Sequence, residues 1–184
     1  MIALVIVIVL VVLLVGYLVL AYNGLVRKRN QVENAWSQID VQLKRRIDLI
    51  PNLVETVKGY AAHERETLEA VVQARNAAIA APDEPVPQAE ANNQLTAALN
   101  RLFALREAYP DLKANQNFLN LQEELTATEG RVAYARQFYN DSVLNYNNKI
   151  ESVPTVFAAR MLGYRQREYF EADEAARTAP NVEF

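Results

Sequence analysis

The sequence predicts an all-α protein that begins with a transmembrane helix. Three observations predict this class: an apolar run over residues 2–22, a helical stripe of apolar residues after it, and a helix-forming composition with 5 Gly and no Cys among 184 residues. We expect residues 1–22 to form the anchor and residues 23–184 to form a helical domain. The anchor is expected to continue directly into the first helix of an antiparallel bundle, built from three long helices and a short C-terminal helix.

The first apolar run is long enough to cross a membrane. About 20 apolar residues, at about 1.5 Å each, span a hydrocarbon core of about 30 Å. A cleaved signal peptide would need a basic residue before the run and small residues at a cleavage site after it. No Lys or Arg precedes Ile2, and Leu20-Ala21-Tyr22 is a poor cleavage site. We therefore predict an uncleaved anchor, with Tyr17 and Tyr22 at the membrane–water interface.

Basic residues follow the anchor. Arg27, Lys28 and Arg29 lie a short distance beyond Tyr22, and no basic residue lies on the other side of the run. The positive-inside rule then predicts that the C-terminal domain faces the cytoplasm and that these three residues contact lipid headgroups.

The next stretch predicts one long helix over residues 23–80. Its apolar residues recur at steps of three and four, which places them on one helical face. This stripe contains Val32, Trp36, Ile39, Leu43, Ile47 and Ile50, and it resumes after Pro51. Pro51 lacks a backbone donor and crowds the carbonyl of Ile47, so we expect a kink there but no reversal of direction.

The remaining turns are marked by proline. Residues 81–87 contain three prolines and predict the first turn of the domain. Helices are then expected over residues 88–109 and 113–150. Pro110 between them is compatible with either a turn or a kink. Gly163 is expected to form a helix C-cap or a turn, and a final short helix is expected over residues 168–177.

Two surfaces are candidates for contacts with partners. The plain interpretation of the apolar stripe is bundle core, and if Pro110 is a kink the two later helices together cover the long helix. In a compact bundle the part of the long helix next to the membrane would instead lack a partner, so Val32, Trp36, Ile39 and Leu43 would form an exposed apolar interface for self-association. The second basic cluster, at residues 44–46, has two interpretations. Lys44, Arg45 and Arg46 form either a solvated helix face with weak surface pairs or a basic ridge for a partner.

The sequence favours no enzymatic site. His63-Glu64 lacks the second His of a zinc-protease motif, because position 67 is Thr67, and Tyr60 replaces the Glu of a Glu-x-x-His motif. We expect no catalytic residue, metal or cofactor. A pI of 5.3 argues against nucleic acid as a partner. The Tyr-Asn pairs at residues 139–140 and 146–147 share a face and predict core tyrosines, with asparagines that are either solvated or fix helix register.

Several long stretches resemble one bacterial family. They are YNGLVRKRNQVENAW (Tyr22–Trp36), IDVQLKRRIDLIPNLVETVKGYAAHE (Ile39–Glu64), YPDLKANQNFLNLQEELTATE (Tyr109–Glu129), YNDSVLNYNNKIESVP (Tyr139–Pro154) and YFEADEAARTAPNVEF (Tyr169–Phe184). Together they are similar to the LemA family of membrane proteins. The resemblance implies a single membrane helix in the bacterial inner membrane, a cytoplasmic helical bundle, and relatives discussed near membrane proteases and in internal-membrane organisation. It carries over no catalytic residue.

These expectations lead to two functional hypotheses. The first is a non-enzymatic scaffold that contacts membrane lipid, forms homo-oligomers and organises or shapes the membrane. The alternative is an adaptor that docks a membrane-protein client, such as a protease or a signalling complex, through residues 44–46. Charge reversal at that ridge is expected to distinguish the two.

Overall fold

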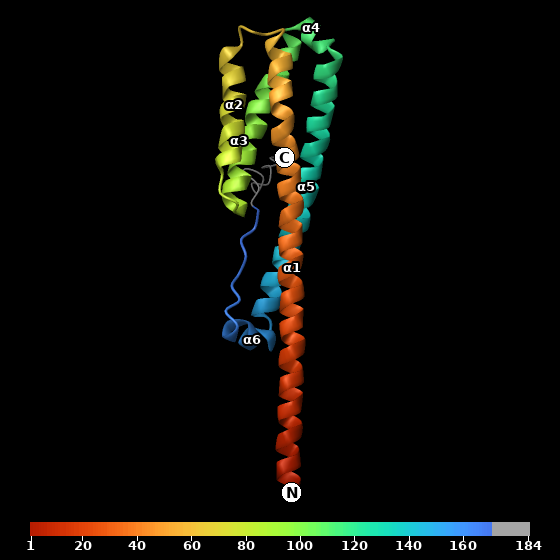
Figure 1. The fold of residues 1–184 in the computed structure, drawn as a ribbon, viewed down its shortest axis with the longest axis vertical. Helices are drawn as coiled ribbons and strands as arrows, with labels where there is room; N and C mark the ends of the chain where they lie inside the picture. The colour runs from red at the N-terminus through yellow and green to blue at the C-terminus, as the bar shows by residue number, and fades with distance from the viewer. Residues whose placement is uncertain (171–184) are drawn as a thin grey trace, which may run out of the picture. The chain divides into compact units, whose positions relative to one another are not determined.

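The protein is described by a computed structural model that covers residues 1–170 in detail. Those residues form helices and no strand, which confirms the predicted all-α class. The elements are α1 (Ile2–Lys58), α2 (Arg65–Ala80), α3 (Pro85–Ala104), the 3-10 turn η1 (Leu105–Glu107), α4 (Pro110–Lys113), α5 (Gln116–Glu151) and α6 (Thr155–Met161) (Figure 1).

The chain divides into two compact units, which we describe one at a time. One unit bears the apolar run that is the candidate membrane span, and we call it the membrane-proximal unit; it contains Met1–Ser37 and Gln137–Glu168. The other, which we call the distal unit because it takes the later part of α1, contains Gln38–Arg136 and, among the described residues, Tyr169 and Phe170. Both α1 and α5 contribute a part to each unit.

In the membrane-proximal unit, α1 and α5 pack antiparallel. Trp36 lies against Tyr139, with ring centroids 5.4 Å apart. Further down α1, a Cβ added at Gly24 would lie 3.8 Å from Cε of Lys149, so close packing continues in the opposite sense along α5. The side chains of residues 1–16 are all exposed, and the buried face of α1 begins at Ala21. The apolar run therefore projects beyond the packed part of this unit.

In the distal unit, segments from five helices share one apolar core. Figure 1 shows α2 running back beside the end of α1, and α3 reversing direction again beside α2. The buried members of this core are Ile50, Leu53, Val57, Ala61, Leu68, Val71, Ala78, Ala91, Leu95, Ala98, Leu99, Leu102, Leu112, Phe118 and Leu125. Apolar residues on both sides of residue 60 thus face the same core from two helices.

The predicted single helix over residues 23–80 is wrong, because α1 ends at Lys58 and α2 begins at Arg65. Gly59 follows the last helical residue, and glycine weakens helix formation because its backbone has more freedom to lose. Hydrogen bonds to distant residues stabilise the turn between α1 and α2. Tyr60 accepts a bond from Nδ2 of Asn115 at 2.8 Å. Glu64, just before α2, accepts one from the hydroxyl of Tyr109 at 2.9 Å. The apolar spacing alone gave no sign of this reversal.

The other predicted breaks agree better with the structure. Pro51 lies inside α1, so the expected absence of a reversal there is confirmed. Pro85 and Pro110 occupy the first positions of α3 and α4, where a missing N–H costs little. Pro110 therefore belongs to a turn between α3 and α5. Of the helix expected over residues 168–177, residues 168–170 are not helical and the remainder lies outside the described residues.

Candidate functional site

A basic cavity lies in the membrane-proximal unit, beside the point where α1 leaves its apolar run. Its volume is about 550 Å³. Residues from α1, from α5 and from the segment after α6 line it: Tyr22, Arg29, Tyr146, Leu162, Gly163, Tyr164, Arg165, Gln166 and Arg167. The cavity therefore joins residues more than a hundred positions apart in the sequence.

The end of α6 turns the chain toward this cavity. Gly163 has φ +72°, a left-handed conformation that favours glycine because it has no Cβ. The amide of Gly163 donates to the carbonyl of Arg160 at 3.2 Å, and the amide of Tyr164 donates to that of Ala159 at 3.0 Å. This pair of bonds is a Schellman cap, which satisfies the last carbonyls of the helix. The cap that the sequence predicts at Gly163 is confirmed.

Polar side chains of α5 hold the segment that follows in an extended path. The hydroxyl of Tyr146 donates to the carbonyl of Arg165 at 2.9 Å, and that of Tyr139 donates to the carbonyl of Glu168 at 2.9 Å. Asn147 makes two bonds to the backbone of Arg167, as a donor at 3.0 Å and as an acceptor at 2.9 Å. The tyrosines are buried, as predicted, and Asn147 anchors this segment.

Burial changes the acidity of these tyrosines. It raises the pKa of Tyr139 to about 12, with smaller opposed effects from Arg167 and Glu168. Burial also raises the pKa of Tyr146, and the charge of Arg167 partly offsets that rise. Both hydroxyls therefore remain protonated donors at neutral pH.

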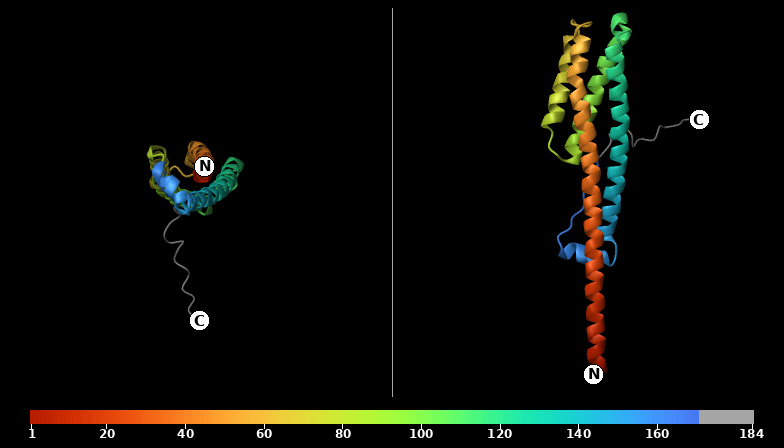
Figure 2. Two further views of the ribbon diagram at one scale, coloured as in Figure 1. Left: turned by 90° about the horizontal axis from the view of Figure 1, so that it is seen from below. Right: turned by 45° about the vertical axis from the view of Figure 1, so that its right-hand side comes forward.

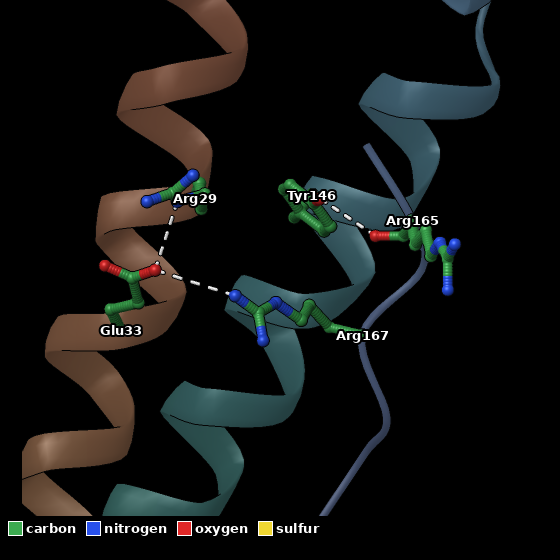
Figure 3. A network of polar contacts seen from close by, with 5 residues as sticks. All are labelled: Arg29, Glu33, Tyr146, Arg165 and Arg167. Atoms are coloured by element: carbon green, nitrogen blue, oxygen red, sulfur yellow. Dashed lines mark hydrogen bonds and ion pairs between the residues drawn. The ribbon is translucent and has the colours of Figure 1, made fainter. Parts of the chain in front are cut away.

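Positive side chains outnumber negative ones around the cavity (Figure 3). Oε1 of Glu33 accepts a hydrogen bond from Nε of Arg29 at 3.1 Å, and the same oxygen lies 3.6 Å from Nη2 of Arg167. Arg165 adds a third guanidinium on the exposed side of the extended segment. One carboxylate thus pairs with two arginines, which leaves an excess of positive charge even before Arg165 is counted.

The same imbalance extends over the whole membrane-proximal unit. Its two sequence segments contain seven basic and four acidic side chains, a net charge of +3, whereas the whole chain has −3. Positive charge is therefore concentrated in the unit that bears the apolar run. Guanidinium groups bind phosphate and carboxylate oxygens with paired hydrogen bonds, so the cavity has the chemistry of an anion site.

The predicted headgroup residues lie in this region. Arg27 and Arg29 are exposed, and Lys28 is half-buried with Nζ 3.4 Å from Oε1 of Gln31. Tyr22 lines the cavity, whereas Tyr17 is half-buried and its hydroxyl is covered, with no hydrogen-bond partner among the described residues. Whether any of these residues contacts lipid stays a prediction.

The premise of an exposed self-association stripe is wrong. Val32, Ile39 and Leu43 are 3%, 0% and 7% exposed within a single chain. Trp36 is half-buried against Tyr139. The physical reason is that α5 is long enough to cover the membrane-proximal part of α1, which the sequence argument left without a partner.

The basic ridge at residues 44–46 does not form one surface. Lys44 pairs with Asp40 at 2.7 Å on the exposed side of α1, and Arg45 pairs with Glu124 of α5. Arg46 points the other way and is 2% exposed. Consecutive helix positions differ by about 100° in direction, so three adjacent residues do not share a face.

Arg46 is held inside the distal unit. Its Nη1 donates to Oδ1 of Asn92 at 2.6 Å, and its Nη2 lies 3.6 Å from Oε1 of Glu129. Its Nε is buried without a partner among the described residues. Burial lowers the pKa of Arg46, and the charge of Glu129 acts in the opposite direction. This residue is a core group and is not available to a partner.

The sequence interpretation missed Arg165, Arg167 and Tyr146 as parts of one site. The available signal was local: two arginines at alternate positions directly after the glycine of a helix cap. In the structure the side chain of Arg167 points toward Glu33, whereas that of Arg165 points away from it (Figure 3). The partner residues on α1 are identified only by tertiary contact.

The His63 region carries no assembled site in the part of the chain that the structure describes. His63 is exposed. Among the described residues, no group of three or more His, Cys, Asp or Glu side chains is placed to hold a metal ion.

The described residues contain one helix long and apolar enough to span a membrane, α1, and none of its apolar window is buried in the chain. With the basic cavity beside this window, the features define a helical protein with one candidate membrane anchor. The chain belongs to the LemA family, whose model matches residues 35–184. The predicted resemblance is confirmed.

Individual relatives agree with this assignment. Protein LemA of Metamycoplasma hominis is 28% identical over 155 residues, which cover 84% of this chain and 71% of the relative. Magnetosome protein MamQ 2 of Paramagnetospirillum magneticum is 25% identical, over 91% of this chain and 71% of the relative. Magnetosome protein MamQ of Magnetospirillum gryphiswaldense is 25% identical, over 88% and 68%.

Proposed function

We propose that the protein is a non-enzymatic, membrane-anchored scaffold: an antiparallel helical bundle that self-assembles on the cytoplasmic face of the membrane and organises or shapes it. The observation that carries this proposal is the continuity of α1, which runs as one helix from Ile2 to Lys58. The apolar anchor enters the packed helices with no linker between them. A scaffold needs this property, because many copies impose a common shape only when each is held in a fixed orientation.

The basic cavity supports the orientation of the bundle on the membrane. Arg29, Arg165 and Arg167 line this cavity, and two of them, Arg29 and Arg167, pair with Glu33. In this proposal they bind the phosphates of anionic lipid headgroups, together with the predicted headgroup residues Arg27 and Lys28. The +3 charge of the membrane-proximal unit is attracted to an anionic leaflet, and the effect falls off within a Debye length of about 8 Å at physiological salt.

The relatives named as magnetosome proteins support a role in organising internal membranes. Confinement of many copies to one membrane raises their effective concentration and favours assembly through weak contacts. The buried stripe at Val32, Ile39 and Leu43 excludes that surface as the contact in the folded chain. The assembly contact therefore belongs to other exposed surfaces of the bundle or to the anchor.

The scaffold is tested with the full-length protein in vesicles of phosphatidylcholine, with and without phosphatidylglycerol. We expect assemblies of many copies, measured by light scattering in mild detergent, and deformed anionic vesicles in electron cryomicroscopy. The double variant R165E/R167E is expected to lose vesicle deformation. R101E/R131E, which alters two exposed arginines of the distal unit, is the matched control.

Monomers or dimers, together with unchanged vesicles, would contradict the scaffold. That outcome would favour the adaptor for a membrane-protein client. The proposed ridge of the adaptor is reduced to Lys44 and Arg45, both of which pair within the chain.

A further inference from the structure

The short helix α6 has its apolar side chains on the wrong side for a helix in water. Its buried residues are small: Thr155, Ala158 and Ala159. Two of its large apolar residues and two that flank it are exposed, whereas Val156 is half-buried: the exposed ones are Phe157 at 68%, Met161 at 71%, Val153 at 77% and Leu162 at 44%. Phe157 and Met161 are four residues apart within α6, so they share one outward face, and the exposed Val153 lies in the turn before the helix. Such a patch on a protein surface marks an interaction site.

The position of α6 indicates what covers this face. Leu162 lines the cavity with Tyr22, so the end of α6 lies beside the end of the apolar run of α1. Figures 1 and 2 show α6 lying crosswise to α1. A helix that crosses a membrane-spanning helix in this way lies along the membrane plane. The end of α6 thus lies beside the point where the exposed apolar surface of α1 ends.

Charge also matches a lipid surface. Arg160 is exposed on α6, and the arginines of the cavity follow it directly in the chain. Helices that lie in the membrane interface combine an apolar face, buried about 5–10 Å into the boundary between headgroups and acyl chains, with basic residues that contact the headgroups. α6 and its flanks have both features.

We propose that α6 is a second membrane contact: Val153, Phe157 and Met161 enter the headgroup–acyl boundary of the leaflet that α1 leaves on its C-terminal side. This inference rests on the proposed anchoring of α1 in the membrane. A single spanning helix is free to tilt and to rotate about its axis, and anchors at its ends restrict both motions. With α6 seated in the same leaflet, the membrane-proximal unit is held at two points and its orientation is set.

The test places a fluorescent label at single cysteines in the full-length protein, in phosphatidylcholine–phosphatidylglycerol vesicles. The chain has no cysteine of its own, so each label reports one site. F157C reports α6, L10C reports the anchor, and Y134C, at a position 72% exposed in the distal unit, is the aqueous control. Quenching is measured with spin-labelled lipid and with iodide present on both sides of the membrane. Circular dichroism verifies that each variant retains its helix content.

We expect the label at Phe157 to be quenched by spin-labelled lipid and to be several-fold less sensitive to iodide than the label at Tyr134. If iodide quenches the label at position 157 as strongly as the label at position 134, while lipid quenches the label at position 10, the role of α6 is overturned and the anchor stands. Protection of Phe157 from both quenchers would also overturn it, because a second protein copy would then cover α6. If iodide quenches the label at position 10, the membrane anchoring on which the inference rests is contradicted instead.

Discussion

Arg75 of α2 compensates for the proline in α1: its Nε donates a hydrogen bond of 3.2 Å to the carbonyl of Ile47. In a regular helix this carbonyl would accept the amide four residues later, but that residue is Pro51, which has no N–H. The helix that folds back on α1 therefore supplies the missing donor. This contact explains how α1 tolerates a proline in its packed part.

The Arg75 bond predicts a double-mutant result. Arg75→Leu removes the donor and is expected to reduce the free energy of unfolding by about 1.5 kcal/mol, the scale of a hydrogen bond to a charged group. In a Pro51→Ala background the new amide of residue 51 competes for the Ile47 carbonyl, so the loss should be clearly smaller. Denaturant unfolding of the four proteins gives the coupling energy, and a coupling of zero would separate Arg75 from the effect of Pro51.

The ring pair of Trp36 and Tyr139 predicts that Trp36 stabilises the chain itself. Trp36→Ala should lower the free energy of unfolding by about 2 kcal/mol, because a half-buried aromatic contact is lost. Thermal unfolding followed by circular dichroism measures the change. Val41→Ala, at an exposed position of the same helix, is the control. Unchanged stability with a smaller assembly would instead place Trp36 between protein copies.

The buried guanidinium of Arg46 predicts that the stability of the protein depends strongly on the bond between Arg46 and Asn92. Arg46→Ala should destabilise the protein by about 3 kcal/mol, because it opens a cavity and leaves Asn92 without its donor. The double variant R46M/N92L replaces the polar pair by apolar volume and should recover much of the loss. Urea unfolding compares both variants with Arg45→Ala. Loss of the surface pair between Arg45 and Glu124 is expected to lower the free energy of unfolding by less than about 1 kcal/mol.

The raised pKa of Tyr139 predicts a loss of stability at alkaline pH. Its folded pKa of about 12 lies above its ordinary value of 10.0, so folding favours the protonated phenol. The contribution is complete below pH 10 and decreases as the pH rises toward 12. Tyr139→Phe cannot ionise, so its free energy of unfolding should fall less between pH 9 and 11.5 than that of the unaltered protein. Parallel pH curves for the two proteins would contradict this assignment.

At neutral pH the same variant measures what the hydroxyl of Tyr139 contributes to stability. Tyr139→Phe keeps the ring against Trp36 and removes the bond to the carbonyl of Glu168. A loss of about 1 kcal/mol is expected, together with faster proteolysis of the extended segment at residues 164–168. Unchanged cleavage would show that Tyr146 and Asn147 hold this segment without Tyr139.

Residue periodicity predicted the helices better than it predicted their partners. The stripe through Val32, Ile39 and Leu43 lies on one helical face, as predicted, and its burial within the chain decides between the two cases, core and interface, that the sequence leaves open. The spacing of apolar residues shows which face leaves water, but the same pattern is compatible with cover from the same chain, from another copy or from lipid. The reversal after Gly59 was missed for a related reason. The stripe continues on both sides of the turn, because α1 and α2 face one core.

The sequence by itself determined the all-α class, the apolar run of α1, the basic flank at residues 27–29 and the turns at proline and at Gly163. These features depend on residues close together in the chain, so local propensity and periodicity are enough to predict them. Tertiary structure alone decided that Arg46 is buried, that Arg75 donates to the carbonyl of Ile47, that Arg29 and Arg167 share Glu33, and that α6 turns Phe157 and Met161 outward. Each of these depends on which distant segments pack together, and periodicity along one segment carries no information about its neighbour.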